Sequence, residues 1–132
     1  MPATVSTPPV TYHNRRFRPA KTTENGEVNA DTVFHYRQEG AVLWATYEGG
    51  GVRHGHMIGT VAANGDLAFR YHHLSAADHH AADNAAGGEP VSGMCHSRLE
   101  VLPDGRYRLF EQWQWTSGDL SAGTSVLEEI DR

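Results

Sequence analysis

The sequence predicts a single all-β domain, folded as an up-and-down antiparallel barrel of about eight strands. Short segments of alternating apolar and polar residues recur along the chain, and turn-forming residues separate them. No segment has the spacing of a long amphipathic helix. We favour a closed barrel over a sandwich because successive strands look hairpin-linked and because closure removes exposed sheet edges.

Length and composition indicate the broad class of protein. The chain has 132 residues, with 39% hydrophobic and 20% charged residues, which is typical of one soluble globular domain. The net charge is −5, and no cluster of Lys and Arg interleaves with aromatic residues, so nucleic acid is not an expected partner. We expect the short basic run Arg15–Arg18 to be a solvated strand face.

The sequence also carries expectations about compartment. No apolar run approaches the ~20 residues that span a bilayer, so no membrane partner is expected. The first residues lack the charged and apolar regions of a signal peptide. The single cysteine, Cys95, excludes an internal disulfide. Together these features predict a cytoplasmic protein.

The first half of the chain gives five strand segments. Residues 1–11 are rich in Pro, Thr and Ser and predict a flexible tail, with the barrel domain over 12–132. A weak strand follows, and the turns after it include Glu39-Gly40, Gly49–Gly51 and Asn64-Gly65, the last being the best hairpin signal. The five predicted strands cover residues 13–18, 32–38, 42–48, 52–61 and 67–73.

The second half gives three more strands after one unusual segment. Residues 74–90 are rich in Ala, Asp, His and Gly, and predict a long loop or lid, or a short helical turn over Ser75–Asp83. Pro103–Gly105 and Ser117–Asp119 are turn signals. The last three predicted strands cover residues 91–102, 106–115 and 124–130.

Strand alternation selects one set of inward-facing residues. Successive strand residues point to opposite faces, so residues two apart share a face. In the seventh strand this places the Glu111 carboxylate on the same face as Trp113 and Trp115. The resulting interior carries tyrosine hydroxyls, a thiol and a carboxylate, which must be paired when buried. A satisfied core network and a ligand pocket both remain open.

Glu111 is the candidate general acid or base, because burial raises a carboxyl pKa toward neutrality. Tyr71 is its candidate catalytic partner, since a tyrosine hydroxyl can stabilise a developing oxyanion. Expected ligand-binding residues share the same inward face. They are Tyr36, Tyr47, Met57, Phe69, His73, Cys95, Trp113 and Trp115.

The histidines and the cysteine do not have the spacing of a metal site or of a catalytic pair. Nine histidines are present, but neither HExxH nor CxxC spacing occurs, and neighbours such as His72 and His73 point to opposite faces. We therefore expect no metal site and no cofactor. The same alternation separates Cys95 from His96, so we expect a packed thiol rather than a nucleophile.

Several short motifs resemble a known family. Tyr12–Phe17, Gly55–Gly59, Phe69–Tyr71, Glu111–Gly118 and Gly123–Glu129 look like segments of small bacterial β-barrel proteins that are commonly labelled N-acetylglutamate synthase-like. The resemblance covers roughly residues 12–130 by this interpretation. It implies a barrel of lipocalin- or avidin-like architecture. The closing Trp-x-Trp-Thr-Ser-Gly strand also looks loosely like the avidin-type meander.

Three functions are compatible with these patterns. The first is a barrel that binds a small, partly apolar molecule in an aromatic pocket containing a carboxylate. The second is a cofactor-free isomerase or cyclase that acts on a small metabolite by proton transfer or by shaping the substrate. The third is a structural, oligomer-forming module with a filled barrel; a homodimer is possible in any of the three. The sequence alone leaves it uncertain whether the protein is an enzyme.

Overall fold

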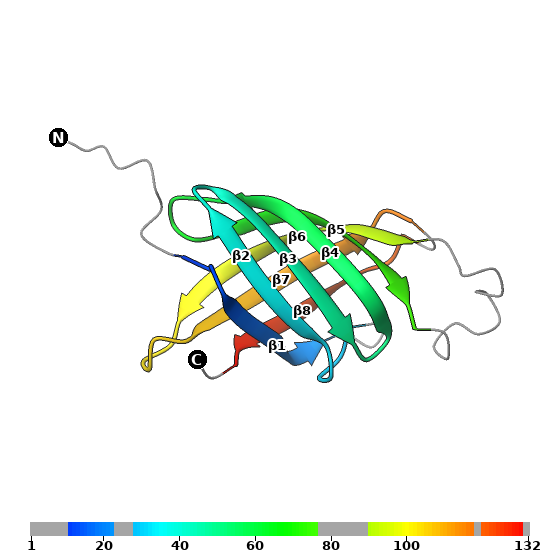
Figure 1. Cartoon of the computed structure of the whole chain (residues 1–132), viewed down its shortest axis with the longest axis horizontal. Coiled ribbons are helices and arrows are strands. Elements are labelled where there is room, and N and C mark those ends of the chain that lie inside the picture. The colour runs from blue at the N-terminus through cyan, green and yellow to red at the C-terminus, as the bar shows by residue number, and fades with distance from the viewer. Residues whose placement is uncertain (1–10, 23–27, 77–89, 118–119, 131–132) are drawn as a thin grey trace.

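The computed structural model describes residues 11–22, 28–76, 90–117 and 120–130, and it shows a closed barrel of eight antiparallel strands (Figure 1). Each strand pairs with the next in sequence, and β1 pairs with β8 to close the sheet. The predicted fold class is confirmed. The strands are β1 (Arg15–Thr22), β2 (Val33–Glu39), β3 (Val42–Gly49), β4 (Val52–Val61), β5 (Leu67–Ser75), β6 (Val91–Val101), β7 (Tyr107–Trp115) and β8 (Ala122–Glu129).

Strand boundaries follow the prediction closely except in β1 and β5. The first strand was expected over residues 13–18, but it runs on through Pro19 to Thr22. The ladder to β8 shifts register between Pro19 and Lys21, and such an irregularity tolerates a residue that has no N–H to donate. Strand β5 continues to Ser75, the residue proposed to cap a helical turn, and positions 77–83 of that turn lie outside the described residues.

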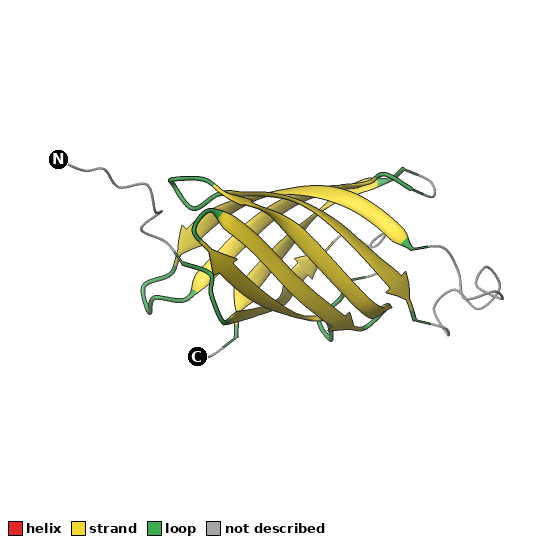
Figure 2. Ribbon diagram, turned by 45° about the horizontal axis from the view of Figure 1, so that its top comes forward, coloured by secondary structure: helices red, strands yellow, loops and turns green. Residues whose placement is uncertain are grey.

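Some predictions fall on parts of the chain that the structure does not describe. The expected tail at 1–11 lies outside the described residues except for Thr11, and so does the loop at 74–90 between Ala76 and Pro90. Figure 2 shows the described barrel with its short turns. Among the described residues, no helix is long and apolar enough to cross a membrane.

The inward face is the one that strand alternation selected. Residues of the chosen set are buried or half-buried, while their neighbours on each strand face outward. Ser125, Leu127 and Glu129 continue the inward pattern on β8. The interior therefore holds both the hydrophobic core and the polar groups that the sequence placed there.

One end of the barrel is filled by Tyr12, which precedes β1. Its side chain is fully buried, and its hydroxyl donates a hydrogen bond to the carbonyl of Gly65 in the β4–β5 turn. Its ring packs against Tyr36 and Tyr107 at centroid distances of 5.8 and 5.4 Å. Burial raises the pKa of the Tyr12 phenol, so it stays neutral. We call this closed part of the interior the plugged half.

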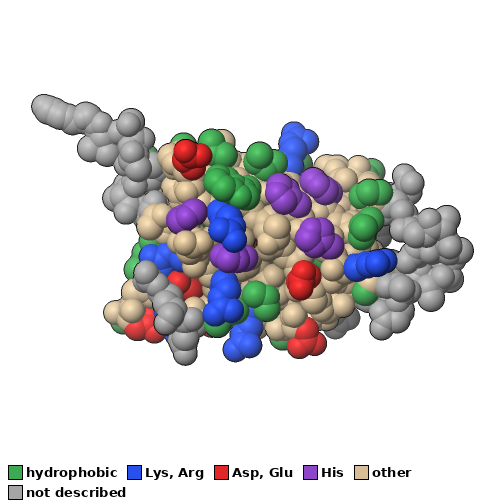
Figure 3. All heavy atoms as spheres, viewed as in Figure 1, with side chains coloured by type: hydrophobic (Ala, Val, Ile, Leu, Met, Phe, Trp, Pro, Cys, Tyr) green, Lys and Arg blue, Asp and Glu red, His purple; other side chains and the backbone are tan. Residues whose placement is uncertain are grey.

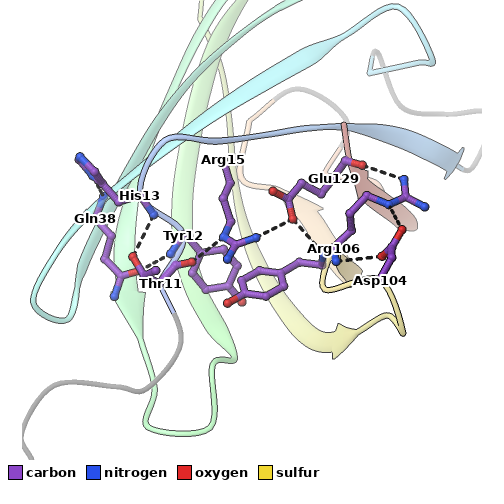
Figure 4. A network of polar contacts seen from close by, with 9 residues as sticks. Thr11, Tyr12, His13, Arg15, Gln38, Asp104, Arg106 and Glu129 are labelled. Carbon is purple, nitrogen blue, oxygen red and sulfur yellow. Dashed lines mark hydrogen bonds and ion pairs between the residues drawn. The ribbon is translucent and has the colours of Figure 1, made fainter. Parts of the chain in front are cut away.

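A buried ion pair ties β1 to β8 in the plugged half (Figure 4). The Arg15 guanidinium donates to a Glu129 carboxylate oxygen at 2.8 Å, and it also lies 3.8 Å from the centroid of the Tyr107 ring. The same oxygen accepts the Tyr107 backbone N–H at 3.0 Å. The expectation of a solvated face over Arg15–Arg18 is therefore wrong at Arg15, because the alternation that exposes Arg16 and Arg18 turns Arg15 inward.

Replacing Arg15 by alanine should strongly lower the free energy of unfolding of the barrel. The change leaves the Glu129 carboxylate buried without its cation, which typically costs about 3–5 kcal/mol. Chemical denaturation of Arg15→Ala measures this loss. The matched control is Arg108→Ala, which breaks partly exposed pairs with Glu100 and Glu128 and should cost far less. Equal losses for the two variants would contradict the structural role of the buried pair.

Candidate functional site

The other half of the barrel contains a cavity, which we call the open half. Its volume is about 50 Å³, and it is partly open to solvent. Drug-sized ligand pockets typically have ~300–1,000 Å³, so this cavity suits a small molecule or one group of a larger molecule. The lining residues are Val28, Phe34, Tyr47, Met57, Phe69, Tyr71, His73, Cys95, Glu111, Trp113, Trp115 and Ser125.

The structure brings nine of the ten predicted site residues to this cavity. Tyr36 is the exception, since it is fully buried in the plugged half, with its ring 4.7 Å from Phe17. Its hydroxyl is a buried polar atom without a hydrogen-bond partner. Tyr36 thus lies beneath the cavity rather than in its wall.

Two glycines allow tyrosine rings to lie flat inside the barrel. Gly55 pairs with Tyr47 across β3 and β4, and Gly93 pairs with Tyr71 across β5 and β6. A Cβ at Gly55 would lie 2.4 Å from the Tyr47 ring, and one at Gly93 would lie 2.2 Å from the Tyr71 ring. Contacts this short are not possible. Each tyrosine ring can therefore take its position only because the residue opposite it on the neighbouring strand is glycine.

Aromatic contacts fix the walls of the cavity. The Tyr47 hydroxyl hydrogen-bonds to Nδ1 of His73 at 2.9 Å, and the Tyr47 ring stacks on Phe34 at 4.7 Å. The ring centroids of Trp113 and Trp115 on β7 lie 6.2 Å apart. The walls are therefore preformed, flat and largely apolar, which suits a small molecule with an apolar body.

Glu111 forms the polar base of the cavity. The Ser97 hydroxyl donates to Oε2 of Glu111 at 3.3 Å, and the Trp113 indole N–H donates to the Ser125 hydroxyl at 3.0 Å. Among the described residues, no Lys, Arg or His forms an ion pair with Glu111. The carboxyl is thus buried with hydrogen-bonding neighbours and no cation.

Burial controls the protonation of this group. Desolvation raises the pKa of Glu111 to about 7, and the Ser97 hydroxyl and Cys95 thiol only partly oppose that shift. Desolvation also raises the pKa of Cys95 and Tyr71, and the nearby Glu111 charge adds to both shifts. At neutral pH the thiol and phenol stay neutral, and Glu111 is near its midpoint.

Among the described histidines, all except His73 are exposed or half-buried, and Figure 3 shows several on one outer face. His56 and His72 pair across β4 and β5 with ring centroids 5.9 Å apart. Across the described ranges, no three His, Cys, Asp or Glu side chains form a group that could hold a metal ion. Cys95 is buried while His96 is exposed, so their side chains point to opposite faces as expected.

Sequence reasoning missed three lining residues for different reasons. Ser125 shares the inward period of β8, so the alternation could have found it. Phe34 shares the inward period of β2 with Tyr36, so the alternation could have found it as well. Val28 precedes β2, outside any strand, and no periodic signal marks it.

A family model described as avidin-like protein matches residues 10–130. The chain belongs to the avidin-like protein family. The resemblance to proteins labelled N-acetylglutamate synthase-like is therefore wrong, because the matching family is a different one. Comparisons with curated proteins and with solved structures gave no significant match. An avidin-like barrel belongs, in broad class, to the small-molecule-binding β-barrels.

The stability of this avidin-like barrel should fall as pH rises through neutrality. The folded pKa of Glu111, about 7, is higher than the usual 4.5, so the folded state binds a proton that the unfolded state has lost. This contribution is complete below pH ~4.5 and is lost as pH passes ~7, a change of about 3 kcal/mol. Denaturation of the native protein and of Glu111→Gln across this range measures it.

The comparison isolates one carboxyl. Glu111→Gln removes the titrating group. The unfolding free energy of the native protein should therefore fall relative to that of the variant as the pH rises from about 4.5 to about 7. A matched control, Glu100→Gln, removes a carboxylate paired with Arg108 on the outer face. If the native protein and Glu111→Gln show the same pH profile, Glu111 does not have a raised pKa.

Proposed function

We propose that this protein binds one small, partly apolar molecule in the open half of its barrel. The observation that carries the proposal is a cavity lined by a buried carboxyl that forms no ion pair among the described residues. A purely structural barrel has no need for such a group, since an unpaired buried carboxyl lowers stability. Avidin-like family membership supports the same broad function.

The arrangement of the cavity supports binding in one orientation. Phe34, Phe69 and Trp113 offer apolar surface, while Glu111 and Ser125 offer hydrogen-bonding groups at one side. Apolar walls contribute affinity, and a few fixed polar groups determine the orientation. The glycine-dependent placement of Tyr47 and Tyr71 keeps the walls rigid, which lowers the entropy cost of binding.

One observation favours a second candidate function, proton-transfer catalysis by a cofactor-free isomerase or cyclase. A carboxyl with a pKa of about 7 can both accept and donate a proton near neutral pH. In that function Glu111 is the acid or base and Tyr71, which also lines the cavity, is its partner. The replacement Glu111→Gln separates the two functions, because it abolishes turnover in an enzyme and leaves an apolar binding site usable.

Small ring compounds should bind in the open half and change its tryptophan fluorescence. Benzyl alcohol is a suitable neutral probe, and biotin is a second one because the family takes its name from avidin. We expect saturable, single-site quenching by at least one of these probes. The signal should come from Trp113 and Trp115, which line the cavity.

Matched tryptophan variants locate the binding site. Trp115→Ala removes a wall residue and should weaken probe binding, whereas Trp44→Phe alters an outward-facing residue of β3 and should not. Non-saturable quenching by both probes, or equal effects of the two variants, would overturn the proposed site.

A further inference from the structure

We infer that the molecule bound in the open half is a small organic cation, a protonated amine whose ammonium group lies against Glu111 and whose apolar body lies among the aromatic walls. The inference deepens the proposed function and rests on it. It follows from the charges, the wall chemistry and the missing partner of one carboxyl.

The side chains of the cavity favour a cation over an anion. Glu111, Cys95 and Tyr71 line the cavity, and each of these groups becomes negative when it loses its proton. Among the described lining residues there is no Lys or Arg, and His73, whose Nδ1 is hydrogen-bonded to the Tyr47 hydroxyl, is the side chain that can carry a positive charge. A bound carboxylate or phosphate would therefore lie beside acidic groups without a permanent counter-charge, at a desolvation cost.

The buried carboxyl lacks the partner that an ammonium group would supply. Around Glu111 the described neighbours offer a hydroxyl hydrogen bond from Ser97 and a weak thiol hydrogen bond from Cys95, but no cation. An ammonium group has three N–H donors, which can reach the carboxylate and a nearby hydroxyl such as Ser125. A charge-assisted hydrogen bond of this kind is roughly twice as strong as a neutral one.

The walls complement a cation as well as an apolar body. Phe34, Phe69, Tyr71 and Trp113 contribute aromatic rings to the lining. The faces of such rings carry partial negative charge and attract a cation, most strongly where water is excluded. Aromatic walls beside a carboxylate thus stabilise an organic cation twice, by ring faces and by the ion pair.

The titration of Glu111 predicts how the affinity for a cation changes with pH. The base His73 on β5 also lines the cavity, and β8 adds the Ser125 hydroxyl. The acids that face Glu111 stay neutral in this range and come from three strands. These acids are Cys95 on β6, Tyr36 on β2 and Tyr71 on β5. A cationic ligand requires the carboxylate form, so binding should strengthen as pH rises through about 7 and should release a proton.

Three probes with the same ring separate the ligand classes. Benzylamine is cationic, benzyl alcohol is neutral and benzoate is anionic between about pH 6 and pH 8. Titration calorimetry at these two pH values should show benzylamine binding most tightly. Its affinity should rise roughly tenfold from pH 6 to pH 8, because the ionised fraction of Glu111 rises by that factor. Buffers of different ionisation enthalpy should reveal about half a proton released per benzylamine at pH 7.

Two variants test the role of the carboxylate. Glu111→Gln should weaken benzylamine binding roughly 30-fold or more, remove its pH dependence and weaken benzyl alcohol binding far less. The circular dichroism spectrum of the variant checks that it folds. Glu100→Gln, on the outer face, should behave like the native protein.

The outcomes distinguish this inference from the proposed function. If benzyl alcohol or benzoate binds as tightly as benzylamine, or if the affinity for benzylamine does not change with pH, the cation inference is overturned. The proposed binding of a small molecule in the open half is then still supported. If none of the three ring probes binds, the cation inference is overturned and the pocket loses its support as well.

Discussion

Closure of the sheet between β1 and β8 is the constraint on which the rest of this structure depends. Once the ring is closed, every inward side chain of all eight strands shares one interior, and none can reach water through a sheet edge. Each polar group that points inward must find its partner there or remain unpaired. The structure solves this in two ways at its two ends.

In the plugged half the buried charges are paired. Arg15 and Glu129 neutralise each other, and the Tyr12 hydroxyl reaches the backbone of the β4–β5 turn. The open half differs because its carboxyl, Glu111, has hydroxyl and thiol neighbours but no cation. The contrast between these two carboxylates in one barrel is the basis for assigning stability to one end and ligand binding to the other.

Much of the fold and part of the site could be predicted from the sequence. The period of two along each strand located the strands and selected the inward face, including Glu111 and Trp113 on β7. Alternation gives the face of a residue but not its depth along the barrel. It therefore grouped Tyr36 with the cavity residues, although Tyr36 lies in the plugged half.

Long-range pairs were beyond the reach of local patterns. Arg15 and Glu129 are 114 residues apart, and only the closed ring brings them together. Tyr12 lies before the first strand and Val28 before the second, where no alternation applies. The motif resemblance correctly indicated the barrel but named the wrong family, because short motifs shared by small barrels carry more information about fold than about descent.

The most direct test of this account is the protonation of Glu111 in the folded protein without ligand. Carbon-13 NMR of the glutamate side-chain carboxyl groups, recorded across the pH range, reports each midpoint, and Glu111→Gln identifies the resonance. The account predicts a midpoint of about 7, because the carboxyl is desolvated and has no cation beside it. A midpoint at the ordinary value of about 4.5 would show that Glu111 is hydrated or paired, and would contradict the central claim.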